Sequence, residues 1–336
     1  KPTGYFHLED LFRMDHFASA AQSGRSPAGI VTVMGTFIMD AYARVERFPL
    51  DGETVLSLDA GSAPGGKGVN QAVAAARQGA SVRMLGAVGD DEDGKRFLRL
   101  LLEEKIDAGR VLISKDAATG KSMIMVDGRA ENRIVVIPGA NHRYSIEDLN
   151  KATEAVASSA LAMIQLEMRR EVNEQMLRVA READVPVVLN PAPASKIDRE
   201  LACGARYFTP NIAELAYYSG MRVESAEDAR AAVKKLLADG FKTVVATLGD
   251  GGAAIGDADG VRVIPGYRVA AVDTVGAGDA FNGAFAARLI AGDDIERAVR
   301  YANAAGALSV TGRGAIPSIP NRAEVLEFME RAGETA

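Results

Sequence analysis

The sequence predicts an α/β fold with a mainly parallel central sheet and helices on both faces. From Ile30 onward, short runs rich in β-branched residues alternate with helical patterns. Such alternation is typical of strands joined by crossover helices. A hydrophobic fraction of 48% can form a large core, and a charged fraction of 25% is ordinary for a globular protein. The 336 residues suffice for one large domain or two modest ones.

The expected elements follow one another closely along the chain. The expected strands are Ile30 to Met34, Val82 to Val88, Leu161 to Leu166, Val185 to Leu189, Arg206 to Phe208 and Thr243 to Thr247. The expected helices are Glu92 to Glu104, Arg170 to Ala183, Asn211 to Ser219 and Glu227 to Ala238. Ligands of such folds bind beyond the carboxyl ends of the strands, so we expect a site at the loops that follow Leu166, Leu189, Phe208 and Thr247.

Two stretches break the alternation. Ala41 to Asp59 and Lys121 to Ile137 have strand character without an intervening helix, and the second has the form of a hairpin that turns near Asp127 and Gly128. Extended pieces outside the central sheet favour a small β-lid, with segments near residues 41–62 and 119–138. In the alternative interpretation these strands only extend the main sheet.

Composition and charge exclude several classes of function. A net charge of −6 without a dense Lys/Arg run argues against nucleic acid as a partner. The single Cys203 excludes an intrachain disulfide, and with only three histidines it leaves no Cys/His metal cluster. No apolar run reaches the length of about 18 residues that a membrane span needs, so we expect no membrane partner.

Residues 1–28 differ from the rest of the chain and lack the basic-then-apolar pattern of a secretory signal. We therefore expect an N-terminal extension outside the fold, a single domain over residues 29–332, and a cytoplasmic protein.

The run DTVGAGDAFNGAF at 273–285 carries the strongest functional signal. Gly276, Ala277 and Gly278 lead directly into Asp279, and apolar residues follow at helical spacing. A glycine-rich turn thus opens a helix whose first N–H groups bind anions. The adjacent carboxylate can accept a proton from a hydroxyl that attacks a phosphate. The alternative is an ordinary helix start with an acidic residue favoured by the helix dipole.

A second glycine-rich run, PGGKGVNQA at 64–72, also leads into a helix. An alanine-rich stretch continues to Gln78, and Gly79 suits a C-cap. Because Pro64 to Gly68 do not suit a helix interior, we expect a turn there. Lys67 and Asn70 offer donors and acceptors for sugar hydroxyls or phosphate oxygens.

Together the two runs resemble the signatures of the ribokinase family of carbohydrate kinases, the PfkB-type kinases. Other family-like segments occur in the same order: MGTFIMD at 34–40, QLE at 165–167, NPAP at 190–193, PNIAE at 210–214, TLGDGG at 247–252, and the tail from Asn303 through GRGAIPS at 312–318. The resemblance covers nearly the whole chain after Ile30. It implies a ribokinase-like three-layer α/β/α sandwich with a β-lid over the sugar, and a homodimer through that lid.

The resemblance implies an ATP-dependent kinase that phosphorylates the primary hydroxyl of a pentose, with ribose giving ribose 5-phosphate. Asp279 matches the catalytic base. The turn formed by Gly276, Ala277 and Gly278 would hold the developing phosphoryl charge. The positions that match sugar contacts are Asp40, Gly66, Lys67, Gly68, Asn70 and Glu167.

Nucleotide and cation contacts are implied in the same way. Asn211 and Glu214 resemble an Asn-x-x-Glu element that orients phosphate and Mg²⁺ through water, although an N-cap Asn with a capping-box Glu fits equally well. The positions that match ATP contacts are Thr247, Leu248, Gly249, Asp250, Gly251, Gly252, Gly278 and Asn303. A loop for K⁺ is matched by Asp273, Val275, Ser309, Gly312, Gly314 and Ser318, and an exposed turn is the alternative there.

One position departs from the family pattern. Ile38 stands where ribokinases usually have an Asn that contacts ribose. An apolar side chain cannot replace a hydroxyl contact, so another pentose or hexose, a deoxysugar or a nucleoside are alternative acceptors. Ribose is favoured by Asp40, Asn70, Glu167 and the triplet GAN at 139–141.

Two rival functions remain. A P-loop NTPase fits the Gly-x₄-Gly-Lys spacing of residues 61–67, but Gly68 stands where a Ser or Thr binds Mg²⁺. A sugar- or nucleotide-sensing binding protein would keep the fold without the chemistry. The intact Asp279 and its turn argue against it.

Overall fold

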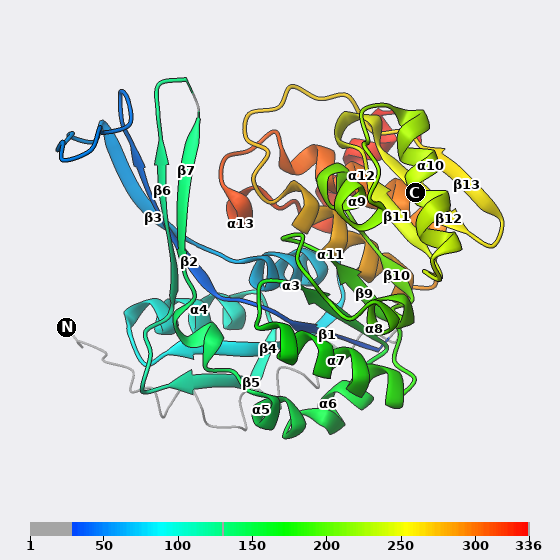
Figure 1. Cartoon of the computed structure of the whole chain (residues 1–336), viewed down its shortest axis with the longest axis horizontal. Helices are drawn as coiled ribbons and strands as arrows, with labels where there is room; N and C mark the ends of the chain where they lie inside the picture. Colours follow the sequence, from blue (N-terminus) through cyan, green and yellow to red (C-terminus); the bar gives the residue numbers. More distant parts are fainter. Residues whose placement is uncertain (1–28, 130, 335–336) are drawn as a thin grey trace.

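A nine-stranded sheet forms the centre of the molecule (Figure 1). The structure is a computed structural model, and it describes residues 29–129 and 131–334. The strand order is β13-β12-β11-β10-β9-β8-β1-β4-β5. All neighbours from β11 to β5 are parallel, and β12 and β13 add an antiparallel edge. The prediction of a mainly parallel sheet is therefore confirmed. The expected extension at 1–28 lies outside the described residues.

The strands of this sheet are short, as the sequence predicts. Their bounds are β1 Ile30–Met34, β4 Ser81–Gly89, β5 Asp107–Ser114, β8 Leu161–Gln165, β9 Val187–Asn190, β10 Tyr207–Phe208, β11 Val244–Thr247, β12 Ala253–Asp257 and β13 Gly260–Ile264. In β1 the side chains of Val31 and Val33 join the core on one face and Met34 joins the core on the other. The central strands are thus buried on both faces, which explains their continuous apolar runs.

Helices cover both faces and complete the three layers. On one face pack α3 Lys67–Arg77, α4 Glu92–Glu103, α11 Ala277–Ile290, α12 Ile295–Ser309, α13 Ala315–Ser318 and α14 Arg322–Arg331. On the other face pack α5 Ile146–Asn150, α6 Thr153–Ala157, α7 Arg170–Glu182, α8 Arg199–Gly204, α9 Ile212–Ser219 and α10 Ala226–Ala238.

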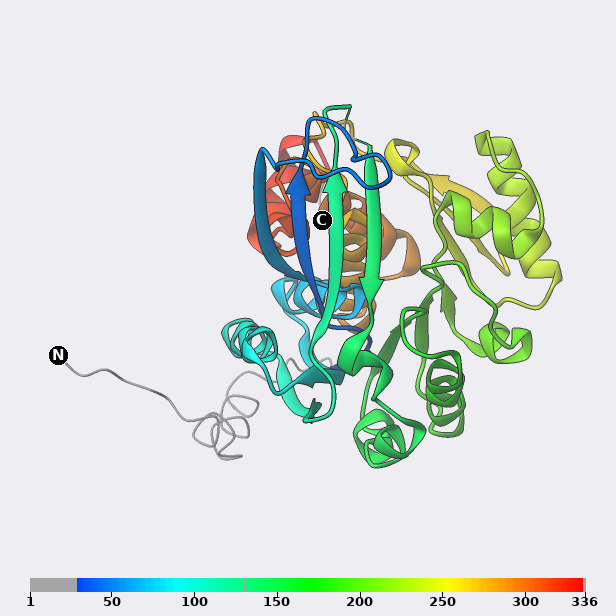
Figure 2. The same cartoon turned by 60° about the vertical axis from the view of Figure 1, so that its left-hand side comes forward.

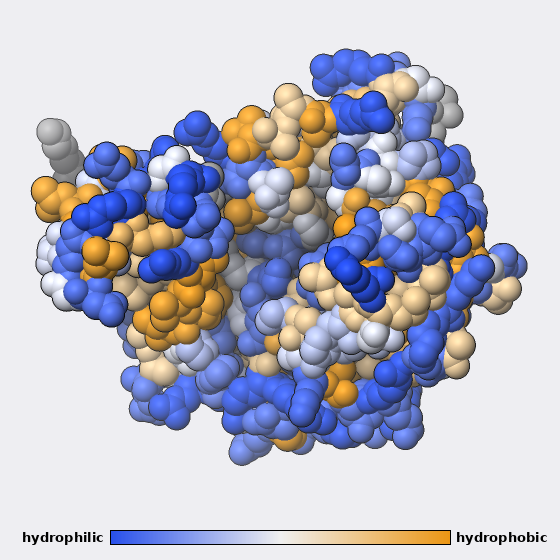
Figure 3. Space-filling view, turned by 45° about the horizontal axis from the view of Figure 1, so that its top comes forward, coloured by the Kyte–Doolittle hydropathy of each residue, from blue (hydrophilic) through white to orange (hydrophobic). Residues whose placement is uncertain are grey.

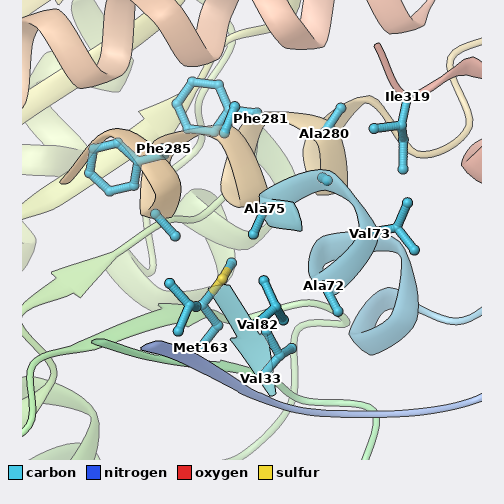
Figure 4. Packing of buried hydrophobic residues seen from close by; sticks show 14 of the residues in the cluster. Val33, Ala72, Val73, Ala75, Val82, Met163, Ala280, Phe281, Phe285 and Ile319 are labelled. Carbon is cyan, nitrogen blue, oxygen red and sulfur yellow. The ribbon is translucent and has the colours of Figure 1, made fainter. Parts of the chain in front are cut away.

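Helices α3 and α11 lie side by side on the middle of the sheet (Figure 4). Ala72 and Ala75 of α3 and Phe281 of α11 belong to the same core as Val33 of β1. Gly283 permits the close approach of the two helices, because a Cβ at this position would lie 2.6 Å from the backbone nitrogen of Ala75. This packing brings the beginnings of the two helices, and hence the two glycine-rich runs, together.

The two stretches that break the alternation form a separate four-stranded sheet in the order β3-β2-β6-β7 (Figure 2). Its strands are β2 Ile38–Arg44, β3 Asp59–Gly65, β6 Gly120–Val126 and β7 Asn132–Ile137. The interpretation that they extend the main sheet is wrong. The expected strand over 41–59 is wrong in its bounds, because residues 45–58 connect β2 to β3 outside any strand.

The described residues include no helix with the length and apolar character needed to cross a membrane.

Candidate active site

The carboxylate of Asp279 lies at the start of α11, where the sequence predicts it. Gly276 precedes the helix with a φ of 81°, a left-handed conformation that favours glycine. The first N–H groups of a helix have no acceptor within it, so they face the region beyond the helix end. Asp279 is 5% exposed, and a Cβ at Gly278 would meet no atom within 4 Å. A buried carboxylate thus adjoins an open, donor-rich turn.

Two consecutive amides from α3 hold this carboxylate. Asn70 donates from Nδ2 to Oδ2 of Asp279 at 2.9 Å, and Gln71 donates from Nε2 to Oδ1 at 2.9 Å. Hydrogen bonds to an ionised acceptor are about twice as strong as neutral ones. The α3 run therefore contacts the carboxylate directly. Sequence reasoning assigned Asn70 to the sugar and did not single out Gln71, because its contacts with Asn190 and Asp279 span 119 and 208 positions and leave no local signal.

Lys67 lies among three carboxylates that come from three different elements. Asp279 contributes most to the raised pKa of its ammonium group, and Glu167 and Glu214 add to the effect. Burial raises the pKa of Glu167, and Lys67 partly offsets that shift. Glu167 also accepts hydrogen bonds from the hydroxyl of Thr36 and, at 3.0 Å, from the backbone N–H of Lys67. Glu167 is therefore fixed beside the first turn of α3.

The second sheet contributes Asp40 near the beginning of α3. The hydroxyl of Ser122 on β6 donates to Oδ1 of Asp40 at 2.5 Å. Burial raises the pKa of Asp40, and this hydrogen bond opposes the shift. Ile38 lies two residues before Asp40 on β2, so both side chains point to the same face of that sheet. Ile38 is buried, with its Cδ1 beside Gly120.

The start of α3 is crowded, because its glycines lie against the backbone of residues 35–38. Gly66 has a φ of 90°, and a Cβ there would lie 2.7 Å from the carbonyl oxygen of Thr36. A Cβ at Gly68 would lie 2.6 Å from Cα of Gly35. The expected turn over Pro64 to Gly68 is confirmed only at Gly66, because Pro64 and Gly65 belong to strand β3 and helix α3 already begins at Lys67.

A cavity of about 900 Å³ opens beside Asp279 (Figure 3). Its walls come from loops at the carboxyl ends of β9, β10 and β11, from the start of α11 and from α12, as the parallel sheet predicts. The predicted site residues among its walls are Lys67, Asn211, Glu214, Thr247, Gly249, Asp250, Gly252, Gly276, Ala277, Gly278, Asp279 and Asn303. Sequence reasoning missed Tyr267 and Arg268, which also line it.

Asn211 and Glu214 form the capping box that the alternative interpretation describes. Oδ1 of Asn211 accepts from the N–H of Glu214, and Oε2 of Glu214 accepts from the N–H of Asn211, both at 2.9 Å. Both residues also line the cavity. Burial raises the pKa of Glu214, and the hydrogen bond from the N–H of Asn211 and the charge of Lys67 oppose that shift. Capping and a place in the site therefore coexist.

The predicted cation loop is assembled from two segments. Oδ2 of Asp273 accepts from the N–H of Gly314 at 2.8 Å, and Oδ1 accepts from the N–H of Val275 at 3.1 Å. The N–H of Gly312 donates to the carbonyl of Ser309 at 3.2 Å, and a Cβ at Gly312 would lie 2.9 Å from Cβ of Ser318. The structure thus joins the segment around Asp273 to the segment around Val310 and Gly314, and Ala315 lies against Gly276.

The P-loop interpretation is wrong. Residues 61–65 belong to strand β3 of the second sheet, and Gly65 pairs with Ile38 of β2. A P-loop instead follows a strand of the central parallel sheet.

The three-layer fold and a carboxylate at a glycine-rich helix start beside a large cleft define a small-molecule kinase. Residues 30–322 match the pfkB family of carbohydrate kinases, and the chain belongs to this family. The chain is 37% identical to a ribokinase of Haemophilus influenzae over 302 residues, and this alignment covers 90% of the chain and 99% of the relative. It is 35% identical over 300 residues to a deoxyribokinase of Salmonella typhi, 89% of this chain and 98% of the relative.

The fold is also that of solved ribokinase structures. Arabidopsis thaliana ribokinase, complexed with ribose and ATP, superposes with a TM-score of 0.84 at 30% identity, covering 90% of this chain and 99% of the other. The predicted carbohydrate kinase and its three-layer fold are confirmed.

Proposed function

We propose that this enzyme transfers the γ-phosphate of ATP to the primary hydroxyl of ribose and forms ribose 5-phosphate. One observation carries the proposal: the buried Asp279 lies between amide donors of α3 and the donor-rich turn that opens on the cavity. The ribokinase relatives support ribose as the acceptor.

In this proposal Asp279 accepts the proton of the attacking hydroxyl, and the N–H groups of Gly276, Ala277 and Gly278 stabilise charge on the transferred group. Lys67 lines the same cavity and adds a positive charge beside the phosphate. Phosphoryl transfer depends mainly on such positioning and electrostatic stabilisation.

The sugar would lie between the second sheet and α3. Asp40 and Glu167 are acceptors for its hydroxyls, and Oδ1 of Asn70 is a buried acceptor without a partner among the described residues. An unpaired buried acceptor is costly, so a hydroxyl donor from the sugar would satisfy it. Gly66 and Gly68 permit the close packing of the α3 start against residues 35–38, which places these acceptors beside one another. The triplet ending in Asn141 has a structural role, because this side chain pairs with both backbone groups of Phe37.

ATP would occupy the cavity beside the loop that connects β11 to β12. That loop contains Thr247, Leu248, Gly249, Asp250, Gly251 and Gly252. Asn303 would lie near the adenine, where its amide donates to the carbonyls of Ile264 and Pro265. Glu214 and Asn211 supply oxygen ligands of the kind that Mg²⁺ and its waters prefer. The ion would neutralise charge on the phosphates.

A monovalent cation would lie in the loop that joins Asp273 and Val275 to Ser309, Gly312, Gly314 and Ser318. The donor set fits K⁺, because it offers one carboxylate and many uncharged oxygens. The ion would order the loops beside Gly276 without touching ATP. Activity in K⁺ should exceed activity in Na⁺ or a bulky organic cation at equal ionic strength. Equal activity in the three salts would remove the ion from the proposal.

The second sheet would act as a lid that excludes water from the sugar, and two copies would pair through it. Its exposed apolar side chains support a contact with a second copy: Met123, Ile134, Val135, Val136 and Ile137. Analytical ultracentrifugation of the native chain and of Val135→Lys measures this pairing. A native monomer at micromolar concentration would contradict it.

A second acceptor, 2-deoxyribose, is favoured by Ile38. This apolar side chain lies on the same face of β2 as Asp40 and cannot pair with a sugar hydroxyl. The deoxyribokinase relative is consistent with this choice. The two sugars differ by one hydroxyl, so their relative kcat/KM values distinguish the two proposals.

The decisive experiment measures ADP release with ATP, Mg²⁺ and K⁺ against a panel of ribose, 2-deoxyribose, hexoses and nucleosides. Ribose-dependent release, with the product phosphorylated at the primary hydroxyl, supports the proposal. If kcat/KM for 2-deoxyribose exceeds that for ribose tenfold or more, 2-deoxyribose replaces ribose as the proposed substrate. Sugar binding without ADP release would instead support a sensing protein.

A further inference from the structure

We propose that Gln71 is a positioning residue that fixes the orientation of the Asp279 carboxylate for phosphoryl transfer. This inference rests on the proposed role of Asp279 as the base. Gln71 is completely buried, on the turn of α3 that faces α11. Gln71 follows Asn70, which we assign to the sugar site. The proposed reaction gives Gln71 itself no contact with sugar or ATP.

All hydrogen-bonding groups of the Gln71 amide are occupied. Its Nε2 donates to Oδ1 of Asp279 at 2.9 Å and to Oδ1 of Asn190 at 3.0 Å. Its Oε1 accepts from Nε2 of Gln165 at 2.6 Å. An amide nitrogen has two protons, and both are used here. Gln71 is therefore the point at which α3, α11 and the carboxyl ends of β8 and β9 meet.

The direction of these hydrogen bonds is determined by the chemistry of their end points. The ionised carboxylate of Asp279 can only accept, and so can the backbone carbonyl of Thr209, which accepts from Nδ2 of Asn190 at 2.9 Å. Asn190 must then present its oxygen to Gln71, and Gln71 must present its nitrogen to Asp279. With these directions every hydrogen bond of Gln71 and Asn190 joins a donor to an acceptor, while Oε1 of Gln165 has no partner among the described residues.

The network also returns to the first turn of α11. The hydroxyl of Thr209 donates to Oδ1 of Asn282 at 2.6 Å, and Nδ2 of Asn282 donates to the carbonyl of Gly278 at 2.8 Å. The same set of hydrogen bonds thus holds the carboxylate and the backbone turn that would receive the phosphate. Their relative placement is what a near-attack geometry requires.

The amide cannot take up the proton that Asp279 collects, so Gln71 does not relay protons. It restrains one carboxylate oxygen, while Asn70 restrains the other, and the rotation of the carboxylate about its χ angles is blocked. Without Gln71 the carboxylate can turn, and Asn190 and Gln165 each lose a partner. The expected consequence is a slower chemical step with little change in ligand binding.

The test compares Gln71→Met with Gln78→Met in the full-length chain. Gln78 is a matched control, because it is a buried amide at the C-cap of the same helix that donates to the carbonyl of Pro320 and accepts from Tyr301, away from the site. Gln71→Met should lower kcat about 10- to 100-fold, as expected for a lost hydrogen bond to a charged group. Its calorimetric Kd values for ATP and ribose should stay at the native values, and Gln78→Met should keep the native kcat.

A double-mutant cycle with Asp279→Asn separates positioning from a purely structural role. Once the carboxylate is absent, Gln71→Met should lower the residual kcat no further, because it acts through that group. An equal loss in both backgrounds, or a native kcat in Gln71→Met, would overturn the inference. Should Gln71→Met fail to fold, Gln71→Glu keeps the size, replaces the donor with an acceptor and should lose kcat similarly. Failure of the proposed function is seen separately, as absent sugar phosphorylation by the native chain.

Discussion

The beginnings of α3 and α11 use the same backbone device with opposite chemistry. Each helix follows a glycine with a positive φ, 90° at Gly66 and 81° at Gly276. The first turn of α3 has no acidic residue and carries Lys67, whereas the first turn of α11 carries Asp279. Because the helices pack together, the Asn70 and Gln71 amides and the Lys67 cation of α3 face the Asp279 carboxylate and the donor-rich turn of α11. Two similar sequence motifs thus supply complementary halves of one site.

The glycines of the two turns also differ in their surroundings. Cβ atoms at Gly66 and Gly68 would press on the backbone of residues 35–38, whereas a Cβ at Gly278 would meet nothing within 4 Å. The glycines of α3 therefore permit close packing against β1 and β2. Gly278 leaves open space where a ligand can approach. Glycine in a motif has a packing role at one helix and a binding role at the other.

The largest effect is expected at the α11 half. Asp279→Asn should lower kcat by at least about 10²-fold, the usual contribution of a general base, while ATP and ribose bind nearly as in the native enzyme. The substitution nearly keeps the shape, removes the charge and basicity, and replaces one acceptor oxygen with an NH₂ group that faces Asn70 or Gln71. Single-turnover kinetics and calorimetry measure the two quantities. Turnover near the native rate would assign the chemistry to another group.

The α3 half is tested by Lys67→Met, which leaves Asp279, Glu167 and Glu214 without their cation. Burial already raises the pKa values of both glutamates, and Lys67 opposes this. Without it these pKa values rise further above the ordinary 4.5, so the folded state binds more protons than the unfolded state. Stability relative to the native chain should therefore fall as the pH rises from 5 to 8, by about 2 kcal/mol.

The sign of this effect depends on Lys67 staying charged over the measured range. Its pKa is raised above the ordinary 10.5, so its stabilising contribution is complete well below that pH. Urea unfolding at pH 5 and pH 8 gives the two free energies. Lys95→Met is the control, because Lys95 pairs with an exposed glutamate at the surface and should change stability much less than Lys67→Met. A deficit of the same size at both pH values would contradict the electrostatic argument.

The contact between the two halves is tested by Gly283→Ala. The added methyl group would press on Ala74 and on the backbone nitrogen of Ala75 at 2.6 Å, so the helices must move apart. Overpacking of this kind costs on the order of 1–2 kcal/mol, and a displaced Asp279 should lower kcat as well. Thermal unfolding and steady-state kinetics measure both effects.

Gly204→Ala provides the matched control, because this helical glycine has no atom within 4 Å of a new Cβ. It should be neutral or slightly stabilising. Equal stability of the two variants would show that α3 and α11 tolerate a wider separation than their packing indicates.

The central sheet could be predicted from the sequence because its strands are buried on both faces. Runs such as Ile30 to Met34 and Leu161 to Leu166 are apolar and bounded by polar turns, and β1 and β8 match them within a residue. Strands β5, β12 and β13 escaped prediction. In β12, with the sequence AAIGD, the reason is that Ala and Gly favour strands weakly. Pairing with β11 makes it a strand.

The bounds of the second sheet failed for a related reason. β3 has the sequence DAGSAPG, which reads as a turn, and Pro64 suits it only because β3 is an edge strand. Its glycines are required by the sheet, since Gly65 lies against Asp40 and Gly61 against the ring of Tyr42. Such cross-strand contacts are set by tertiary pairing and leave no period in the sequence.

Motifs predicted which residues gather at the site, but not which of them contact one another. Asp279 and Lys67 could be chosen because glycine-rich helix starts have a recognisable pattern. The contacts of Asp279 with Asn70 and Gln71 depend on side-chain directions across packed elements.

The smallest effect is expected at Ile38, which lies beneath the α3 turn. A Cβ at Gly66 would be 2.9 Å from the backbone nitrogen of Ile38, and Ile38 pairs with Gly65. If its side chain faces the sugar, ribose binds without one polar partner. Ile38→Asn should then lower the KM for ribose about fivefold, the equivalent of one hydrogen bond worth about 1 kcal/mol. The KM for 2-deoxyribose should not improve.

Ile38→Leu is the control for packing, because it nearly conserves volume and adds no hydrogen-bonding group. Its ribose KM should match the native value, and thermal unfolding of both variants measures what the buried amide costs in stability. A native enzyme that prefers 2-deoxyribose or a nucleoside by about 10²-fold in kcat/KM, together with weaker ribose use by Ile38→Asn, would make the apolar wall a specificity device. The ribose assignment would then fall. The pairing of the α3 and α11 halves would stand, because the proposed roles of Asp279 at the attacking hydroxyl and of Lys67 beside the phosphate do not depend on which acceptor is used.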